Sequence, residues 1–442
     1  MQLAGDEVDM LFWEADICHI LSWYHGAEQH GLYWESGTDL TFADVSLRDR
    51  GEYPEKKVIT LTKAFMPDVG SWMDDLVRMY NRQSREYTLE LISYDGKSDF
   101  DKFGQLEKQL LKGEGPDLME LGNVDALNLA GKGVLEDLTE YYERSNKVDW
   151  QDLLPKIQES SVLNGRNALV IPFFYIRTWV SKDAVPAEDW TLRRFLEMAQ
   201  ECQMFPSSNP YALLVNSMTI PYMERFIDYG KKECYFNSPE FKEILGAFAA
   251  VPSREVHKGT YSADYLEDEY LLYLWNFRSM SDYLAVRDFW GDNVDYQGVP
   301  GWEGAEHALL ASDVFAMNSA STNKEGAWDF LEFLLSREVQ DSAGWGFPAR
   351  ADSMDVYLDR SYINSEDAKA AGRVYSGAQP EEEDFAAVRD MISASSYTTI
   401  FEAGDVVDRI IKEEAAMYFS GDATLEQTAE KIQNRVMLYL NE

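Results

Sequence analysis

Aromatic side chains stand at turns and predicted strand ends along the chain, where they can meet a ligand. Between Gly298 and Arg350, Trp302 lies in a glycine-rich turn and Trp345 lies between two glycines. Aromatic rings bury a large area with little loss of rotamer freedom, and their flat faces match the C–H faces of sugar rings. The candidate ligand-binding rings are Phe65, Phe174, Tyr175, Trp275, Trp302, Trp345 and Tyr397. The alternative is that these rings are ordinary members of a core.

Three polar residues accompany these rings, namely Asn123, Asn276 and Glu303, and they could pair with ligand hydroxyl groups. Glu303 and the distant Asp125 could also serve as the two carboxylates of a glycosidase, but one sequence does not show that they meet. The chain has no nucleophile elbow, phosphate-binding loop or HExxH motif. We therefore predict a binding protein with no catalytic residue, and a glycoside-acting enzyme is the weaker alternative.

The balance of charge argues against anionic partners. The chain has 40 lysines and arginines against 78 aspartates and glutamates, which gives a formal net charge of -38. Such a field repels nucleic acid and anionic membrane surfaces, and it tolerates neutral or cationic ligands. We therefore expect no nucleic-acid partner.

Cysteine and histidine spacing predicts neither a disulfide framework nor a metal site. The three cysteines are Cys18, Cys202 and Cys234, far apart and in no CxxC arrangement. His19, His25 and His30 are irregularly spaced, and no carboxylate or cysteine completes a ligand set. We expect no metal and no cofactor.

The first half of the chain alternates between buried strands and amphipathic helices. The predicted elements are a strand at 58–61, a helix at 72–80, a strand at 87–93, a helix at 103–110 and a strand at 117–121. This alternation predicts a parallel sheet with right-handed crossovers. Ligands of such sheets bind beyond the carboxyl ends of the strands, so the loops that carry Phe65 and Asn123 should lie at one rim.

A later strand carries three consecutive rings, Phe173, Phe174 and Tyr175, within the extended stretch Asn167–Ser181. Because side chains alternate along a strand, three consecutive rings cannot all face one core. At least one ring should therefore face solvent or a ligand. The stretch Leu271–Trp290 predicts another strand, with Trp275 at its end, that leads into a helix.

The first 55 residues differ from the rest of the chain. Trp13, Trp23 and Trp34 recur at a spacing of roughly ten residues, which together with turn signals favours short antiparallel strands. The turn signals are Gly26, Gly31 and Gly37. We predict that residues 1–55 are a β-rich remnant, the tail of an upstream domain.

Five stretches, in order, resemble a known family. They are GEGPDLMELGNVDALNLAGKGVLEDLTEYYE (113–143), DWTLRRFLEMAQ (189–200), FIDYGKKECYFNSPEFKEIL (226–245), SASTNKEGAWDFLEFLLSREVQ with the later GFPAR (319–350), and the ending at 410–442. Over residues 57–442 the chain resembles the extracellular solute-binding proteins of ABC transporters. The likeness is to the carbohydrate-binding, maltose-binding-protein-like family, as found in gut Firmicutes.

The resemblance implies a two-lobed α/β fold of the type II periplasmic-binding-protein class, with a hinge between the lobes. The first lobe would consist of residues 56–172 and 298–336, and the second of residues 173–297 and 337–442. The ligand would lie in the cleft between them. In the loop after the third strand, where the best-known member of the family has charged ligand contacts, this chain has Val124 and Asp125, which argues against maltose.

The resemblance also implies a function. A sugar or oligosaccharide would be captured in the cleft and delivered to the permease subunits of an ABC transporter. The protein would be an extracytoplasmic monomer, anchored to the membrane as a lipoprotein or held at the cell surface. The N-terminus shows no basic and apolar leader regions, so either a leader and upstream sequence were removed or the assignment to the cell exterior is wrong. The alternative is a module that senses or presents a ligand without transport.

Overall fold

The structure is a computed structural model that describes most of the 442-residue chain. The described ranges are 7–14, 17–30, 33–46, 55–62, 72–94, 99–121, 126–181, 185–201, 203–205, 209–211, 214, 224–228, 231–253, 270–290, 294–311, 313–342, 346–360, 380–395, 397–399 and 406–441. For the first three ranges the backbone alone is described. Within these ranges, no helix combines the length and apolar character that a membrane span requires.

The smaller of the two main sheets has the strand order β17-β6-β4-β5. Its strands are β4 (Lys57–Thr62), β5 (Tyr87–Ile92), β6 (Leu118–Glu120) and β17 (Phe315–Met317). β4 runs parallel to β5 and β6, and β17 runs antiparallel to β6. The predicted parallel arrangement of the first three strands is confirmed, and a strand from far along the chain completes the sheet.

Helices pack around this sheet, and one of them arrives late in the chain. They are α1 (Trp72–Gln83), α2 (Asp99–Leu110), α3 (Ala126–Gly131), α4 (Thr139–Arg144), α5 (Pro155–Ser161) and α10 (Lys324–Leu334). Tyr80 of α1 meets Phe330 of α10 edge-on, with 5.1 Å between ring centroids, and its hydroxyl donates to Asp329. A Cβ at Gly326 would lie 2.6 Å from the ring of Tyr87, so glycine permits this close approach of α10 to β5.

The larger sheet has eight strands and is built around β9. Its strands are β9 (Phe173–Ser181), β10 (Gln203–Phe205), β13 (Tyr270–Phe277), β14 (Asp295–Pro300), β15 (Ala305–Glu306), β16 (Ala308–Ala311), β18 (Phe347–Pro348) and β19 (Tyr397–Thr399). β13, β14, β16 and β18 all pair antiparallel with β9. These neighbours supply hydrogen-bond partners along β9, as a buried strand requires.

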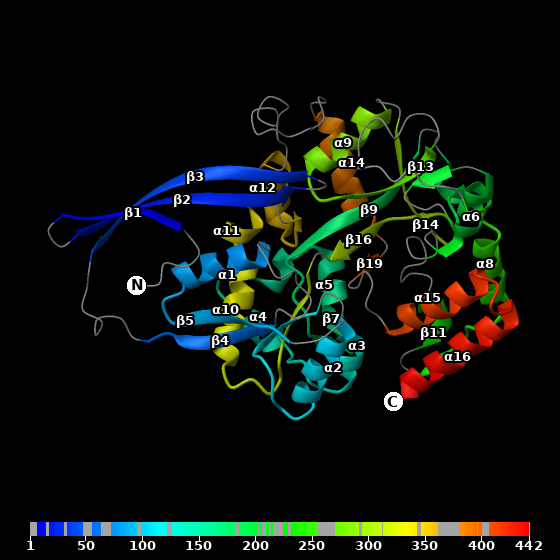
Figure 1. Cartoon of the computed structure of the whole chain (residues 1–442), viewed down its shortest axis with the longest axis horizontal. Helices are drawn as coiled ribbons and strands as arrows, with labels where there is room; N and C mark the ends of the chain where they lie inside the picture. The colour runs from blue at the N-terminus through cyan, green and yellow to red at the C-terminus, as the bar shows by residue number, and fades with distance from the viewer. Residues whose placement is uncertain are drawn as a thin grey trace.

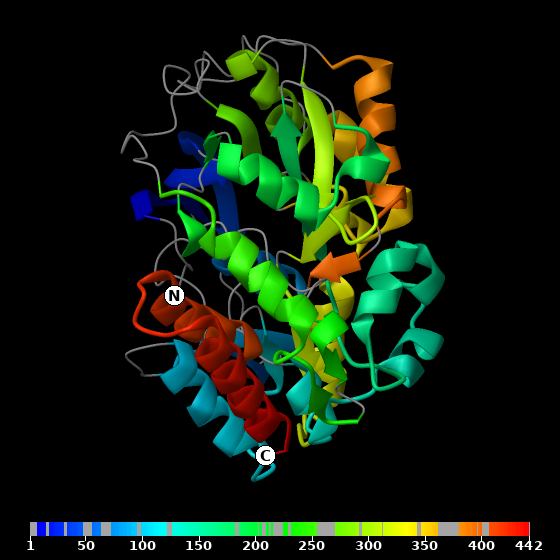
Figure 2. The ribbon, with the colours of Figure 1, turned by 90° about the vertical axis from the view of Figure 1, so that its right-hand side faces the viewer.

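Two apolar clusters cover the two faces of the larger sheet. One cluster contains Trp179 and the helices α6 (Leu192–Glu201), α8 (Pro239–Ala249), α15 (Val406–Phe419) and α16 (Leu425–Asn441). The other is continuous with the core of the smaller sheet and includes residues of α9 (Met280–Trp290), α11 (Arg337–Gln340), α12 (Met354–Arg360) and α14 (Glu382–Ser393). Figure 2 shows α15 and α16, in orange and red, as an adjacent pair of helices.

Two pairs of two-residue strands also form. β7 (Val162–Leu163) pairs with β8 (Arg166–Asn167), and β11 (Ile227–Asp228) pairs with β12 (Glu233–Cys234), both antiparallel. The thiol of Cys234 is free and buried, and burial raises its pKa to about 11. A thiol with so high a pKa is a weak nucleophile at neutral pH.

Three connections lead from one main sheet to the other. The first runs from Val170, which forms a β-bridge with Phe315 of β17, to Phe173 at the start of β9. The second runs from β16 to β17, and the third from α10 to β18. The pairing of β14 and β16 with β9 puts residues 298–311 in the larger sheet. This differs from the division predicted from sequence, which assigned these residues to the first lobe.

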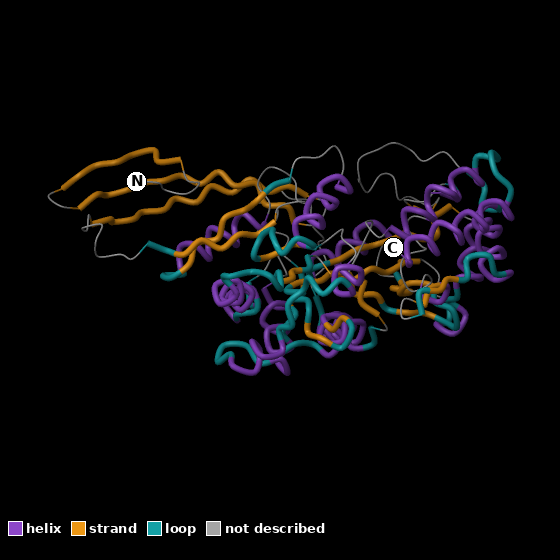
Figure 3. Tube along the Cα trace, turned by 90° about the horizontal axis from the view of Figure 1, so that it is seen from below, coloured by secondary structure: helices purple, strands orange, loops and turns teal. Residues whose placement is uncertain are grey.

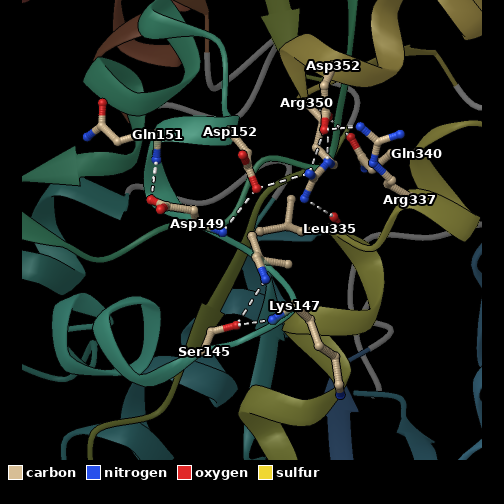
Figure 4. Close-up of polar contacts among 11 residues, drawn as sticks. Ser145, Lys147, Asp149, Gln151, Asp152, Leu335, Arg337, Gln340, Arg350 and Asp352 are labelled. Carbon is tan, nitrogen blue, oxygen red and sulfur yellow. Dashed lines mark hydrogen bonds and ion pairs between the residues drawn. The ribbon is translucent and has the colours of Figure 1, made fainter.

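A buried arginine, Arg350, stabilises the third connection, which runs from α10 to β18. Arg350 is 4% exposed, and its guanidinium pairs with Asp352 at 2.9 Å and with Asp152 at 3.0 Å. Its Nη1 donates to the carbonyl oxygen of Leu335 at 3.5 Å (Figure 4). Leu153 forms a β-bridge with Arg350. A charge with so little exposure needs partners of this kind, and the cluster ties residues on both sides of the connection together.

The N-terminal strands form a separate sheet of order β1-β2-β3. Its members are β1 (Glu7–Glu14), β2 (Ile17–His30) and β3 (Tyr33–Ser46), all antiparallel. The sheet extends from one end of the molecule (Figures 1 and 3). Gly26 and Gly37 lie opposite each other within β2 and β3, so the prediction of turns at these two glycines is wrong. Glycine permits turns but also adopts extended backbone. Here both glycines are extended, and the two strands continue past them.

Candidate ligand-binding site

Alternation along β9 and β13 places two of the predicted rings in the core. Trp275 pairs with Thr178, which shares a face of the sheet with Phe174. Phe174 is 0% exposed and Trp275 is 7% exposed, and the Trp275 indole N–H donates to the carbonyl oxygen of Asp282 at 3.0 Å. The strand also continues past Trp275 to Phe277, so Trp275 is not at the strand end as predicted. We therefore leave both rings out of the proposed ligand set.

The opposite face of the same strands carries a row of polar and aromatic residues that we call the open-face row: Tyr175, Arg177, Asn276 and Arg278. Asn276 is exposed and lies opposite Arg177, whose Nε donates to its Oδ1 at 2.9 Å. Tyr175 is half-buried, and the Arg278 guanidinium lies 5.9 Å from its ring centroid. Trp179 shares this face but is packed against α6, so the row begins where the helical cover ends.

Two buried carboxylates of the smaller sheet act on the same region. Glu120 is 3% exposed and ends β6, and Asp313 is 7% exposed and lies two residues before Phe315, the partner of Glu120. Burial and the charge of Glu120 raise the pKa of Asp313 well above its usual range, whereas Arg278 acts to lower it. Glu120 is the last residue of β6, at the end of the strand where ligands of parallel sheets bind.

Trp302 and Glu303 line a different pocket, of about 350 Å³, between α6 and α8. The Arg225 guanidinium lies 4.7 Å from the Trp302 ring, and Arg225 also pairs with Glu240 at 3.3 Å. Phe226 meets the same ring edge-on at 6.4 Å. This pocket and the open-face row share no residue, so the structure does not bring Trp302 and Glu303 together with Tyr175. The glycine-rich turn was visible in the sequence, but the sheet face toward which it folds was not.

Four predicted ligand residues have no described side chain. Phe65, Asn123 and Trp345 lie outside the described residues, as does the alternative carboxylate Asp125. Tyr397 is described by its backbone, which pairs with Ala308 in the parallel β16–β19 ladder. The roles of these residues therefore remain predictions.

Sequence reasoning missed the charged members of the site, which are Arg177, Arg278, Glu120 and Asp313. A signal for the two arginines was present, because each lies two residues after a predicted site residue, Tyr175 or Asn276, and period two marks one face of a strand. For the two acids the local sequence gives no such signal.

These features define a class of protein. Two α/β lobes joined by three connections are typical of the type II periplasmic-binding-protein fold. Residues 88–341 match the family model described as bacterial extracellular solute-binding protein. The match covers more than half of the 442 residues, and the chain belongs to this family.

Solved structures share the fold. The sugar-binding protein MalE from Xanthomonas citri has a TM-score of 0.57 and 15% identity, over 87% of this chain and 98% of its own. An ABC substrate-binding protein from Listeria monocytogenes, in complex with cycloalternan, has a TM-score of 0.55 and 17% identity, over 88% of this chain and 100% of its own. The maltose/maltodextrin-binding domain from Bdellovibrio bacteriovorus, bound to maltotriose, has a TM-score of 0.55 and 11% identity, over 87% of this chain and 100% of its own. No curated protein sequence matches the chain. The predicted two-lobed α/β fold is confirmed.

Proposed function

We propose that the protein captures a sugar or oligosaccharide between its lobes and delivers it to the permease subunits of an ABC transporter. The observation that carries this proposal is the open-face row on β9 and β13, in a chain of the solute-binding family. The Tyr175 ring offers a flat apolar surface, and Arg177, Asn276 and Arg278 offer donors and an acceptor for hydroxyl groups. The solved relatives bound to cycloalternan, maltotriose and tagatose support a carbohydrate ligand.

We further propose an extracytoplasmic location, which the family description supports. Of the division predicted from sequence, residues 56–172 for the first lobe and residues 173–297 and 337–442 for the second remain our proposal. The pairing of β14 and β16 with β9 supports a later boundary, in the crossing between β16 and β17. Binding would proceed without covalent chemistry, so a bound glycan should be recovered unchanged by chromatography.

A glycan panel tests the ligand class. Maltose, maltotriose, cycloalternan and tagatose would be screened by thermal unfolding, because a ligand bound only by the folded state raises the Tm. The best ligand would then be titrated by calorimetry into the wild type and into Tyr175→Ala. We expect Tyr175→Ala to weaken binding at least tenfold, which is about 1.4 kcal/mol, because the sugar loses its aromatic platform.

The matched control is Tyr235→Ala, because Tyr235 is 47% exposed and lies outside the open-face row. It should bind the glycan as tightly as the wild type. If no glycan raises the Tm while another class of small solute does, the carbohydrate assignment is wrong and the family assignment stands.

A further inference from the structure

The cross-strand neighbours of Arg177 and Tyr175 are neutral. Asn276 of β13 lies opposite Arg177 on one side, and Ala308 of β16 lies opposite it on the other. Leu310 of β16 lies opposite Tyr175. Directly paired residues share a face, and opposite charges at such positions stabilise a sheet. Here those positions hold an amide and two apolar side chains, so the sheet places no acid directly opposite Arg177.

Arg278, the second arginine of the open-face row, also lies apart from acids. Elsewhere, Arg287 pairs with the buried Asp384, and Arg350 pairs with Asp352 at 2.9 Å. Arg278 is half-buried, like Arg287, but its guanidinium lies 5.9 Å from the centroid of the tyrosine ring in the row. Among the described residues it pairs with no carboxylate. A partly buried charge is stabilised by a partner, so this position favours an anion from outside the chain.

The charge of Arg278 also acts on a buried acid of the smaller sheet. It acts to lower the pKa of Asp313, although the two side chains form no ion pair. Asp313 and Glu120 are both buried, so they offer a bound ligand almost no surface. A ligand on the open face would therefore contact the guanidinium and not these two acids.

Donors dominate the hydrogen-bonding groups of the row. Each guanidinium has five N–H donors and no acceptor, and an asparagine amide has two donors and one acceptor oxygen. That oxygen of Asn276 already accepts from Nε of Arg177 at 2.9 Å. A sugar hydroxyl donates as well as accepts, whereas a carboxylate only accepts. The row therefore matches a carboxylate better than it matches hydroxyl groups alone.

We propose that the open-face row selects an acidic sugar, which is a uronic acid or an oligosaccharide that contains one. The sugar ring would lie against Tyr175, and its carboxylate would pair with Arg278 and Arg177. The planar fork of a guanidinium fits the two oxygens of a carboxylate, and charge-assisted hydrogen bonds are roughly twice as strong as neutral ones. The inference rests on the proposed function and narrows its ligand class.

The net charge of -38 is compatible with an acidic ligand. The Debye length at physiological ionic strength is about 8 Å, so more distant exposed carboxylates are largely screened from the ligand. A guanidinium in contact with the ligand is not screened in this way. The acidic surface would slow the approach of an anion, but the two arginines would decide which charge binds in the row.

Matched pairs of sugars test this selection. Calorimetric titration at neutral pH would compare galacturonate with galactose, glucuronate with glucose, and digalacturonate with galactobiose. Within each pair, the acid differs from its neutral parent by its carboxylates. We expect at least one acid to bind tenfold or more tightly than its parent, which is about 1.4 kcal/mol. Arg278→Gln should lower that ratio several-fold and change the affinity for the neutral parent little, because only the charged contact is lost.

The matched control is Arg435→Gln, which breaks pairs with Glu413 and Glu414 inside the C-terminal helices and should keep the wild-type ratio. Arg177→Gln is the second test variant, and it keeps the inference testable if Arg278→Gln does not fold. A ratio that persists in the folded test variants would overturn the inference.

The outcomes also separate this inference from the proposed function. If neutral glycans bind and no acid binds more tightly than its parent, the selection of acids is wrong and sugar capture stands. If acids bind with the expected ratio while the neutral panel fails, both proposals hold for acidic sugars. If no sugar of either kind binds, the proposed function fails and the inference fails with it.

Discussion

The two faces of β9 and β13 carry neighbouring residues to opposite environments. On one face Phe174 and Trp275 are buried in an apolar cluster. On the other, Tyr175 is half-buried and Asn276 is exposed. Phe174 is adjacent to Tyr175 in sequence, and Trp275 is adjacent to Asn276. Local composition therefore does not tell core residues from open-face residues here, but the alternation of side chains along the strand does. An aromatic residue in a binding-protein strand is thus assigned to core or ligand by its position in the alternation.

The largest expected difference between the faces is in stability. Trp275→Ala should lower the free energy of unfolding by about 3–5 kcal/mol, because it removes a buried ring and leaves the Asp282 carbonyl without its indole donor. Tyr175→Ala should lower it by about 1 kcal/mol or less. Urea unfolding of both variants checks this. Equal losses would show that the two faces do not differ in burial.

A second contrast uses one residue type in two environments. Arg350→Gln should cost about 3 kcal/mol, since it removes a buried guanidinium that pairs with both Asp152 and Asp352 and leaves Arg337 as the charged partner of Asp352. Arg177→Gln, on the open face, should cost a few tenths of a kcal/mol, roughly what an exposed pair is worth. Thermal unfolding of both variants at neutral pH measures the difference. A large loss for Arg177→Gln would place that residue in the core and contradict the open face.

The same buried cluster should show in the pH dependence of stability. The hydrogen bond from Arg350, aided by Arg337, holds the pKa of Asp352 below its usual range. A lowered folded-state pKa adds stability above the unfolded-state pKa, and this is lost as the pH falls through the folded value. The difference in unfolding free energy between wild type and Asp352→Asn should thus be largest near neutral pH and shrink below about pH 4.

The control for Asp352→Asn is Asp355→Asn, because the side chain of Asp355 is 78% exposed and pairs with Arg389 at the surface. It should change the unfolding free energy little at any pH. If the wild type instead gains its advantage over Asp352→Asn as the solution becomes acidic, the carboxylate is not held in its charged form.

The smaller sheet could be predicted from sequence because its signals are local. The strand predicted at 58–61 is β4 and the helix predicted at 72–80 is α1, each within a few residues. The larger sheet could not, because β13 and β16 reach β9 from far along the chain and no local pattern specifies their register.

The candidate site likewise contains some residues that could be predicted from sequence and others that could not. Tyr175 could be predicted because three consecutive rings require one to leave the core. The placement of Arg278 by the Tyr175 ring could not, because it depends on the pairing of β13 with β9, which are far apart in the chain. Trp302 was predicted from its turn, but which side of the sheet that turn covers is a tertiary property.

The smallest expected effect concerns the hydrogen bond between Arg177 and Asn276. Both side chains lie on the open face, where water replaces a broken bond at little cost, so a double-mutant cycle in unfolding should give a coupling of about 0.5 kcal/mol or less. On the proposed function, a bound glycan would exclude water from this face, and the same groups would have to be satisfied by each other or by ligand hydroxyls. The cycle repeated by calorimetric titration should then give a larger coupling, with Asn276→Ala weakening affinity several-fold while barely changing the Tm. A strong coupling in the unliganded protein would make the pair a structural contact, and an equal coupling in both cycles would place the ligand elsewhere.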